Sequence, residues 1–265
     1  MFRSPGAVAF ELGAISIHWY GILIALAFVV ALIVSTKVAR DKGENPENFI
    51  DLATIVLICA LIGARIYYVI FNFDYYAENP VEIIKIWHGG LAIHGGMLGG
   101  LIGGYIFTSM KKLSFLRYCD ITVIGLILGQ AIGRWGNFFN SEAFGIPTNL
   151  PWKLFIPLEN RPYNYMDSEF FHPTFLYESL WNLGVFLVLF FFIRKKFKHL
   201  DGAVFFSYIA LYSLGRMFIE ALRTDSLMFL GDFRAAQLAS AFLIIIAVIG
   251  FEIINHRYRK KNDQQ

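Results

Sequence analysis

The chain has 265 residues, of which 57% are hydrophobic and 16% are charged, and its mean hydropathy is +0.54. Soluble domains carry about 25% charged residues, so this composition excludes an ordinary soluble protein and indicates an integral membrane protein. The net charge of +3 says little, because the basic residues are spread unevenly, and we find no nucleic-acid motif. Two cysteines, Cys59 and Cys119, are too few for a disulfide framework, and we interpret both as packing residues.

Seven apolar segments are each long enough to span a bilayer. They run approximately over residues 18–36, 50–71, 92–110, 118–138, 174–193, 203–222 and 234–254. This pattern predicts an all-α polytopic membrane protein that forms one domain, residues 1–265. The longest connection, residues 139–173, carries five prolines and is too polar to span, so we expect it to form a small extramembrane cap.

The basic residues predict the orientation of the chain. Four stretches, residues 37–42, 111–117, 194–198 and 257–261, hold 14 of the 23 Lys and Arg residues, and all four fall on one side of the predicted bundle. Lys and Arg concentrate on the cytoplasmic side of membrane proteins. We therefore expect the N-terminus and the cap to lie outside and the C-terminus to lie in the cytoplasm.

Glycines recur every four residues in two of the segments, at Gly95, Gly99 and Gly103 and at Gly125, Gly129 and Gly133. Small residues at this spacing let helix backbones approach closely in lipid. We expect segments 92–110 and 118–138 to form the centre of the bundle.

A polar motif closes the segment 118–138, and it runs from Gly133 to Gly145 with the sequence GRWGNFFNSEAFG. Arg134 lies just inside the end of a membrane helix, where an ionisable residue is a functional-site hypothesis by default. Its planar fork of donors suits a phosphate, and Asn137 shares its helix face. The alternative interpretation is an Arg134–Glu142 ion pair that holds the helix end.

Polar residues also mark the predicted outer ends of the other segments. These residues are His18, Trp19, Tyr20, His94, His172, Tyr177, Glu178, Arg216, Glu220 and Arg223. Tyr212, Arg216, Glu220 and Arg223 share one helix face, which must point inward. An internal Arg216–Glu220 salt bridge is the alternative to a ligand site, and the two can coexist. For Arg65 we expect structural pairing with a carboxylate.

Three further stretches accompany the central motif: HGGLAIHGG at 88–96, HPTFLYE at 172–178 and YSLGR at 212–216. With the central motif, they resemble the signatures of the prolipoprotein diacylglyceryl transferases, and they occur in that family's order. The resemblance implies transfer of a diacylglyceryl group from phosphatidylglycerol to the lipobox cysteine thiol of a preprolipoprotein, with release of glycerol phosphate. It also implies a bacterial cell membrane location with the active site toward the outer leaflet.

We expect Arg134 and Arg216 to be catalytic, because both can stabilise the charge that develops on a phosphate leaving group. A base must also remove the thiol proton, since the thiolate is the nucleophile. His94 is the first candidate for this base and Tyr20 the second. The expected substrate-binding residues are Arg134, Asn137, Asn140, Glu142, Gly145, Tyr177, Glu220 and Arg223.

The sequence contains no helix-borne His-Glu pair at metal-ligand spacing and no nucleophile elbow, so we expect no metal, no cofactor and no covalent enzyme intermediate. A transporter for an anionic lipid or solute is the rival class, because intramembrane arginines can also bind and release a substrate. Transport predicts polar residues through the whole bilayer and often internal repeats. The inner halves of the predicted helices are nearly free of charge and no repeat is visible, which favours the enzyme over both the transporter and a structural scaffold.

Overall fold

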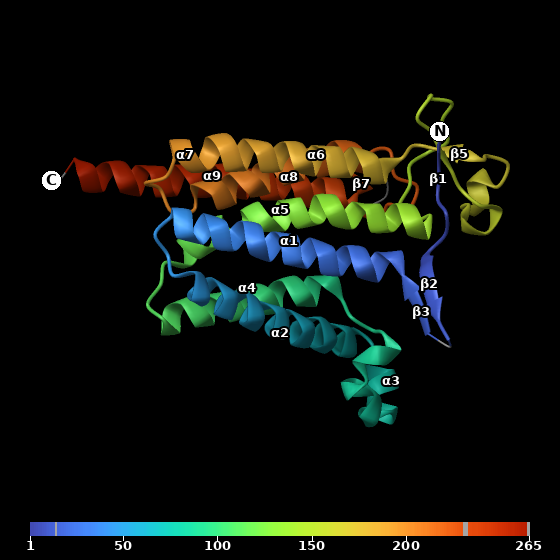
Figure 1. The fold of residues 1–265 in the computed structure, drawn as a ribbon, viewed down its shortest axis with the longest axis horizontal. Coiled ribbons are helices and arrows are strands. Elements are labelled where there is room, and N and C mark those ends of the chain that lie inside the picture. Colours follow the sequence, from blue (N-terminus) through green and yellow to red (C-terminus); the bar gives the residue numbers. More distant parts are fainter. Residues whose placement is uncertain (14, 230–232, 264–265) are drawn as a thin grey trace. The chain divides into compact units, whose positions relative to one another are not determined.

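The computed structural model describes residues 1–13, 15–229 and 233–263, and helices make up most of these ranges (Figure 1). The chain divides into two compact units, residues 1–35 together with 120–265, and residues 36–119. The long helices are α1 (Trp19–Asp41), α2 (Pro46–Phe71), α4 (Ile93–Met110), α5 (Phe115–Asn140), α6 (Thr174–Val188), α8 (Ala203–Glu220) and α9 (Ala235–Asn262).

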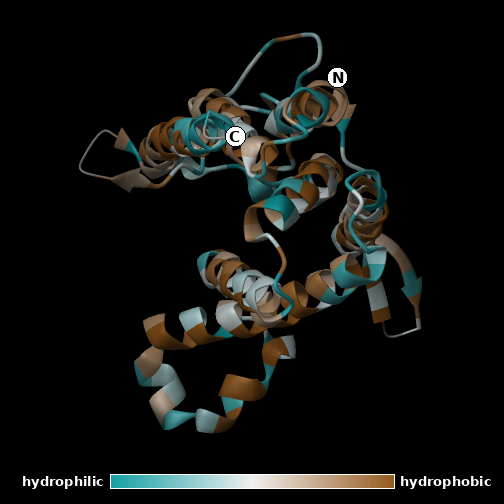
Figure 2. Cartoon of the chain, turned by 90° about the vertical axis from the view of Figure 1, so that its left-hand side faces the viewer, coloured by the Kyte–Doolittle hydropathy of each residue, from teal (hydrophilic) through white to brown (hydrophobic). Residues whose placement is uncertain are grey.

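Six helical stretches within the described ranges are long and apolar enough to cross a membrane. They are α1, α2, α5, α8, α9 and the stretch Thr174–Lys196, which joins α6 to a π-helical turn (Leu189–Ile193) and α7 (Arg194–Lys196). Hydrophobic residues cover much of the helices (Figure 2), and many of them are exposed, such as Phe242 on α9 at 63%. An apolar surface of this extent needs an apolar surrounding, so the chain is a multi-pass membrane protein.

The seventh predicted span, residues 92–110, is helical as α4, but it is not among the six stretches. Six glycines in its 18 residues lower its mean hydropathy. The same glycines serve packing. A Cβ added to Gly63 of α2 would lie 2.9 Å from the Cα of Gly99, so the two backbones lie in direct contact within residues 36–119.

The second glycine row also packs closely, as predicted, but against a different helix. A Cβ added to Gly129 of α5 would lie 3.2 Å from the carbonyl oxygen of Ala27 on α1. The two rows therefore build two interfaces, α2 with α4 and α1 with α5. Each row faces its own partner helix, and the expectation that segments 92–110 and 118–138 form the centre of the bundle stays a prediction.

Short strands add to the predicted all-α fold. Strands β2 (Val8–Leu12) and β3 (Ile15–His18) form an antiparallel hairpin before α1, and β6 (Met228–Phe229) pairs with β7 (Phe233–Arg234). Their hydrogen bonds are local to each pair, so they leave the helical architecture unchanged.

The segment between α5 and α6 folds around its own apolar cluster. Strand β4 (Leu154–Phe155) pairs in parallel with β1 (Phe2–Arg3) and antiparallel with β5 (Phe170–Phe171). Strands β4 and β5 and the adjoining helix ends contribute to one cluster of buried side chains, which are Phe138, Phe144, Leu154, Ile156, Phe171 and Phe175. The sheet ties the beginning of the chain to this segment, and the cluster anchors the segment on the ends of α5 and α6.

A buried carboxylate fixes the start of α8. Asp120 near the beginning of α5 is fully buried, and it accepts hydrogen bonds from the main-chain nitrogens of Gly202 (3.0 Å) and Phe205 (2.8 Å). These nitrogens belong to the first turn of α8, where a side-chain oxygen satisfies otherwise unpaired donors. The contact sets the axial position of α8 against α5, and the opposite ends of these two helices carry Arg216 and Arg134.

Candidate functional site

The central motif reverses the chain at the end of α5. Ser141 and Ala143 adopt positive φ angles of 51° and 56°, which turn the backbone sharply after Asn140. Glu142 thereby comes back to the helix end, where its Oε1 accepts hydrogen bonds from Asn137 Nδ2 (2.9 Å) and Asn140 Nδ2 (3.3 Å). Three of the predicted binding residues therefore form one connected cluster.

Glu178, in the first turns of α6, joins three arginines. Its Oε2 lies 2.6 Å from Arg134 Nη2, and its Oε1 lies 3.0 Å from Arg216 Nη1 and 3.3 Å from Arg223 Nη1. Residues from α5, α6 and the end of α8 thus converge on one carboxylate. The alternative Arg134–Glu142 pair is wrong, because the partner of Arg134 is Glu178 while Glu142 binds the two asparagines.

Two further carboxylates hold Arg216 on α8 and Arg223, which follows that helix. Arg216 Nη2 lies 2.7 Å from Glu220 Oε2, one turn along the helix, at a distance of an ion contact but outside hydrogen-bond geometry. Arg223 binds Asp225 through two hydrogen bonds of 2.8 and 2.6 Å. Arg234 donates to the main-chain carbonyl of Glu220. The Arg216–Glu220 pair that the spacing of four residues predicted is confirmed.

The exposed fractions of these side chains show which groups of the cluster are buried and which are accessible. Glu178 and Glu220 are only 5% and 3% exposed, whereas Arg134 and Arg216 are 23% and 22% exposed. The carboxylates therefore lie beneath the guanidinium groups. A guanidinium has five N–H donors, so carboxylates held below leave donors available on the accessible side. This arrangement suits the binding of an anion.

The pKa values outside the helices agree with a charged cluster. Burial alone would raise the pKa of the Asp225 carboxyl, but hydrogen bonds and charge from Arg223 outweigh it and hold that pKa below its usual value. Burial would likewise lower the pKa of Arg223, and Asp225 raises it instead. Both groups are therefore ionised at neutral pH.

Tyr20 and Gly145 lie against the same region of the fold. A Cβ added to Gly136 would lie 2.6 Å from the ring of Tyr20, so this tyrosine packs on the motif, and it is 41% exposed. Gly145 donates its main-chain N–H to the carbonyl of His172 (2.9 Å), and a Cβ there would lie 2.7 Å from His172 Cβ. No side chain fits at Gly145.

Tyr177 points its hydroxyl at residues before α6. The hydroxyl oxygen accepts a hydrogen bond from Trp152 Nε1 (2.9 Å) and lies 3.1 Å from His172 Nδ1. Burial lowers the pKa of His172, so this ring is neutral at physiological pH. The contacts described for the Tyr177 hydroxyl are thus to the cap segment, while its neighbour Glu178 faces the arginines.

His94 and Arg65 belong to the second compact unit. His94 is the second residue of α4, is exposed, and has its ring centroid 6.1 Å from that of Tyr67 on α2. Arg65 is 7% exposed and donates to four main-chain carbonyls, among them those of Ile83 (2.8 Å) and Gly90 (2.8 Å). The expectation that Arg65 pairs with a carboxylate was wrong, because main-chain carbonyl oxygens accept the hydrogen bonds of its guanidinium instead.

A cavity of about 320 Å³ lies beside Arg65, also within the second unit. Its walls include Tyr68 and Tyr76, and the Arg65 guanidinium lies 5.1 Å from the centre of the Tyr76 ring. Arg65 thereby closes residues 82–90 onto α2, and these residues lead directly into the helix that begins next to His94.

Sequence reasoning placed Glu178 among the polar residues at the helix ends but gave it no role, and it did not single out Asp225 at all. A carboxylate one turn inside an apolar helix is a signal in its own right, and this rule would have found Glu178. Asp225 has no such signal, because it lies in a short polar connection where a carboxylate is ordinary.

The fold and the site together define a class of protein. It is a polytopic membrane protein whose helix ends gather arginines and buried carboxylates into a site suited to an anionic ligand.

The comparisons with known proteins name the family. The family model described as "Prolipoprotein diacylglyceryl transferase" matches residues 7–253. A protein of Acaryochloris marina is 51% identical over 94% of this chain and 91% of its own length, and one of Nostoc sp. is 49% identical over 99% and 94%. A protein of Thermotoga maritima is 48% identical over 95% and 86%. All three are named phosphatidylglycerol--prolipoprotein diacylglyceryl transferase. The chain belongs to the prolipoprotein diacylglyceryl transferase family.

Proposed function

We propose that this chain transfers the diacylglyceryl group of phosphatidylglycerol to the lipobox cysteine thiol of a preprolipoprotein, a step of lipoprotein maturation. Its membership of the family and the names of its relatives support the reaction. The observation that carries the site is the sharing of Glu178 by Arg134 and Arg216, one carboxylate oxygen for each. This contact brings the two expected catalytic cations to one point.

The reaction forms a carbon–sulfur bond and breaks a carbon–oxygen bond. The acceptor thiolate attacks the carbon of the diacylglyceryl group that carries the phosphate ester oxygen, and the thioether forms. Glycerol phosphate leaves with the electron pair of the broken carbon–oxygen bond. Negative charge therefore grows on the phosphate oxygens in the transition state. Arg134 and Arg216, held in place by buried carboxylates, can donate to those oxygens without reorganising. The scheme requires no cofactor.

The other binding residues have assignable roles around this centre. Asn137 and Asn140, fixed by Glu142, present amide groups for the glycerol or phosphate oxygens. Glu220 orients Arg216, and Arg223 adds positive charge behind both arginines. Gly145 and Tyr177 shape the cap side of the site, because Gly145 admits no side chain and Tyr177 is fixed by Trp152.

His94 is proposed to take the thiol proton, with Tyr20 as the second candidate. If so, His94→Gln should lower kcat by about 10²–10⁴-fold and change the KM for phosphatidylglycerol little. Raising the pH toward the thiol pKa, about 8.5, should partly restore the rate because more acceptor is already ionised. Initial rates between pH 6.5 and 9 measure this, with Tyr20→Phe as the comparison. A defect confined to the donor KM would assign His94 to lipid binding.

We further propose seven membrane spans, with α4 as the seventh, the N-terminus and cap outside, and the C-terminus in the cytoplasm of a bacterial cell membrane. In a chain whose Cys59 and Cys119 are replaced by serine, an impermeant thiol reagent should label Tyr163→Cys in intact cells. It should label Asp263→Cys only after permeabilisation. The reverse pattern would overturn this orientation.

The direct test of the function is incubation of the purified protein with phosphatidylglycerol and a lipobox peptide. Mass spectrometry should detect a peptide heavier by one diacylglyceryl group, together with one equivalent of glycerol phosphate. A peptide whose cysteine is replaced by serine is the control and should remain unmodified. Movement of phosphatidylglycerol across vesicles without any modified peptide would favour transport instead.

A further inference from the structure

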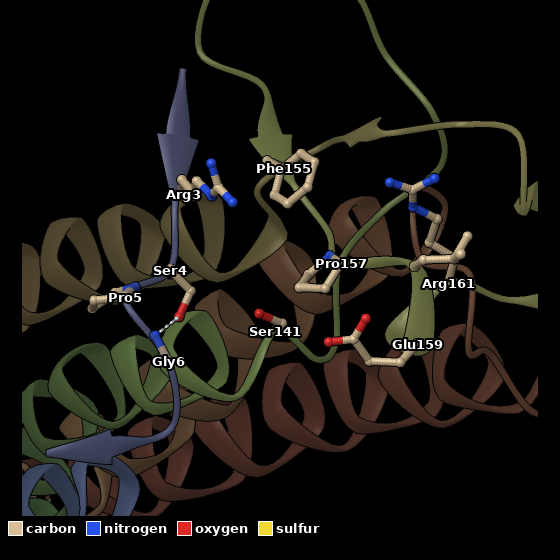
Figure 3. Close-up of a pocket in the computed structure, with 10 residues that line it drawn as sticks. Arg3, Ser4, Pro5, Gly6, Ser141, Phe155, Pro157, Glu159 and Arg161 are labelled. Carbon is tan, nitrogen blue, oxygen red and sulfur yellow. Dashed lines mark hydrogen bonds between the residues drawn. The ribbon is translucent and has the colours of Figure 1, made fainter.

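A second cavity, of about 450 Å³, opens in the cap segment of the first unit (Figure 3). Its walls come from three parts of the chain: the end of β1 and the next residue (Arg3 and Ser4), Ser141 directly after α5, and the stretch from Phe155 to Arg161. Sites for small molecules measure about 300–1,000 Å³. The cavity is therefore large enough for a small ligand or for a short stretch of extended polypeptide.

Three hydrogen bonds fix this cavity to the end of the central motif. Asn160 Nδ2 donates to the carbonyls of Asn140 and Ser141, both at 3.2 Å, and Ser4 Oγ donates to the carbonyl of Phe139 at 2.9 Å. Ser141 lines the cavity, and the next residue, Glu142, holds the two asparagines of the candidate site. The cavity and the candidate site are therefore joined by one continuous stretch of backbone.

The chemistry of the walls is mixed. The Arg3 guanidinium lies over the Phe155 ring at 4.8 Å, and the Glu159 carboxylate points across the cavity toward Ser141 (Figure 3). Among the described residues, neither of these two charged groups has a hydrogen-bond or ion-pair partner. Leu158, 54% exposed, adds an apolar wall.

This combination discriminates between possible ligands. An extended polypeptide presents carbonyl acceptors, N–H donors and side chains together, which match a guanidinium, a carboxylate and an apolar wall. A phosphate monoester would gain from Arg3 but would be opposed by Glu159, since like charges repel. Arg161, the second cation of the walls, already donates to the main-chain carbonyls of Ile156 (3.0 Å) and Met166 (3.0 Å).

We propose that this cavity binds the polypeptide segment that follows the acceptor cysteine, in an extended conformation, and so selects acceptors by the residues immediately after the thiol. The inference rests on the proposed function, because it assumes a polypeptide acceptor whose thiol lies at the arginine site. The acceptor chain must leave the membrane surface toward water, and the cap provides a polar surface directly beside the motif.

A charge reversal tests the selection. Two acceptor peptides that differ only in carrying Lys or Glu shortly after the cysteine are compared by kcat/KM. The wild type should prefer the Lys peptide because of Glu159, and Glu159→Lys should shift the ratio by about 3–10-fold toward the Glu peptide. Asp167→Lys, an exposed change in the same segment that does not line the cavity, should leave the ratio as it is. An unchanged ratio in Glu159→Lys, with normal turnover, would overturn the proposed role of the cavity and leave the proposed function intact.

A binding test does not depend on turnover. In the chain without native cysteines, Leu158→Cys is labelled with a maleimide while an acceptor peptide with serine in place of its cysteine is present. At ten times its Kd, the peptide should slow labelling about tenfold and should leave Tyr163→Cys, 92% exposed, unaffected. Protection by glycerol phosphate but not by peptide would make the cavity an anion site, and protection by neither would mean that it is unused. Failure of the wild type to modify any peptide would instead count against the proposed function.

Discussion

Arg134→Ala and Arg216→Ala should each lower kcat/KM by about 10²–10³-fold, and the double variant should be scarcely slower than either single one. Each loss has the size expected for removing a donor that stabilises developing charge. Residues that act as a unit on one charge are not additive, and the two guanidinium groups share Glu178 at 2.6 and 3.0 Å.

Rates with phosphatidylglycerol and a lipobox peptide measure this, and circular dichroism and thermal unfolding in detergent check the fold. Arg194→Ala, at the opposite end of the α6 stretch, is the matched control and should retain nearly full activity. If the single losses multiply in the double variant, the two arginines act on separate charges. Arg216 would then be better explained as a structural partner of Glu220.

Local patterns made much of this fold predictable. The apolar segments are long, so the starts of six spans were identified within a few residues, although α1 and α9 continue to Asp41 and Asn262, beyond the predicted ends. The motif at the end of α5 identified Arg134 from its charge in an apolar setting. The Arg216–Glu220 pair follows from a spacing of four residues on one helix. These features depend on residues that are close in sequence, where helix geometry fixes their relation.

The features that the sequence did not reveal join distant parts of the chain. Glu178 meets Arg134 across 44 residues, and β1 meets β4 across 152. A two-residue strand has no measurable alternation, so no pattern predicts either the sheet or its partner. Arg65 was misread for a related reason, because main-chain carbonyls are present at every residue and give no sequence signal for the partner of a cation.

Glu178→Gln should impair both stability and activity, because it removes the negative charge that three arginines share. The change keeps the size of the side chain but leaves Arg134, Arg216 and Arg223 with one buried carboxylate, Glu220, and the more exposed Asp225. Breaking a buried ion pair costs about 3–5 kcal/mol, and a loss of 3 kcal/mol corresponds to a fall of about 6–12 °C in the unfolding midpoint. Without their common anchor the two catalytic guanidinium groups should separate, so the rate should fall at least about 100-fold.

Two further variants separate charge balance from orientation. Glu220→Gln is the matched control, since Glu220 contacts Arg216 at 2.7 Å and Arg223 at 4.0 Å but has no described contact with Arg134, and its rate should fall by no more than about tenfold. Glu178→Gln combined with Arg223→Gln restores the charge balance, so the unfolding midpoint should recover in part. The rate should stay low in this combination, because no carboxylate then holds Arg134 beside Arg216. Recovery of the rate together with the midpoint would mean that Glu178 serves only to balance charge and does not position the catalytic arginines.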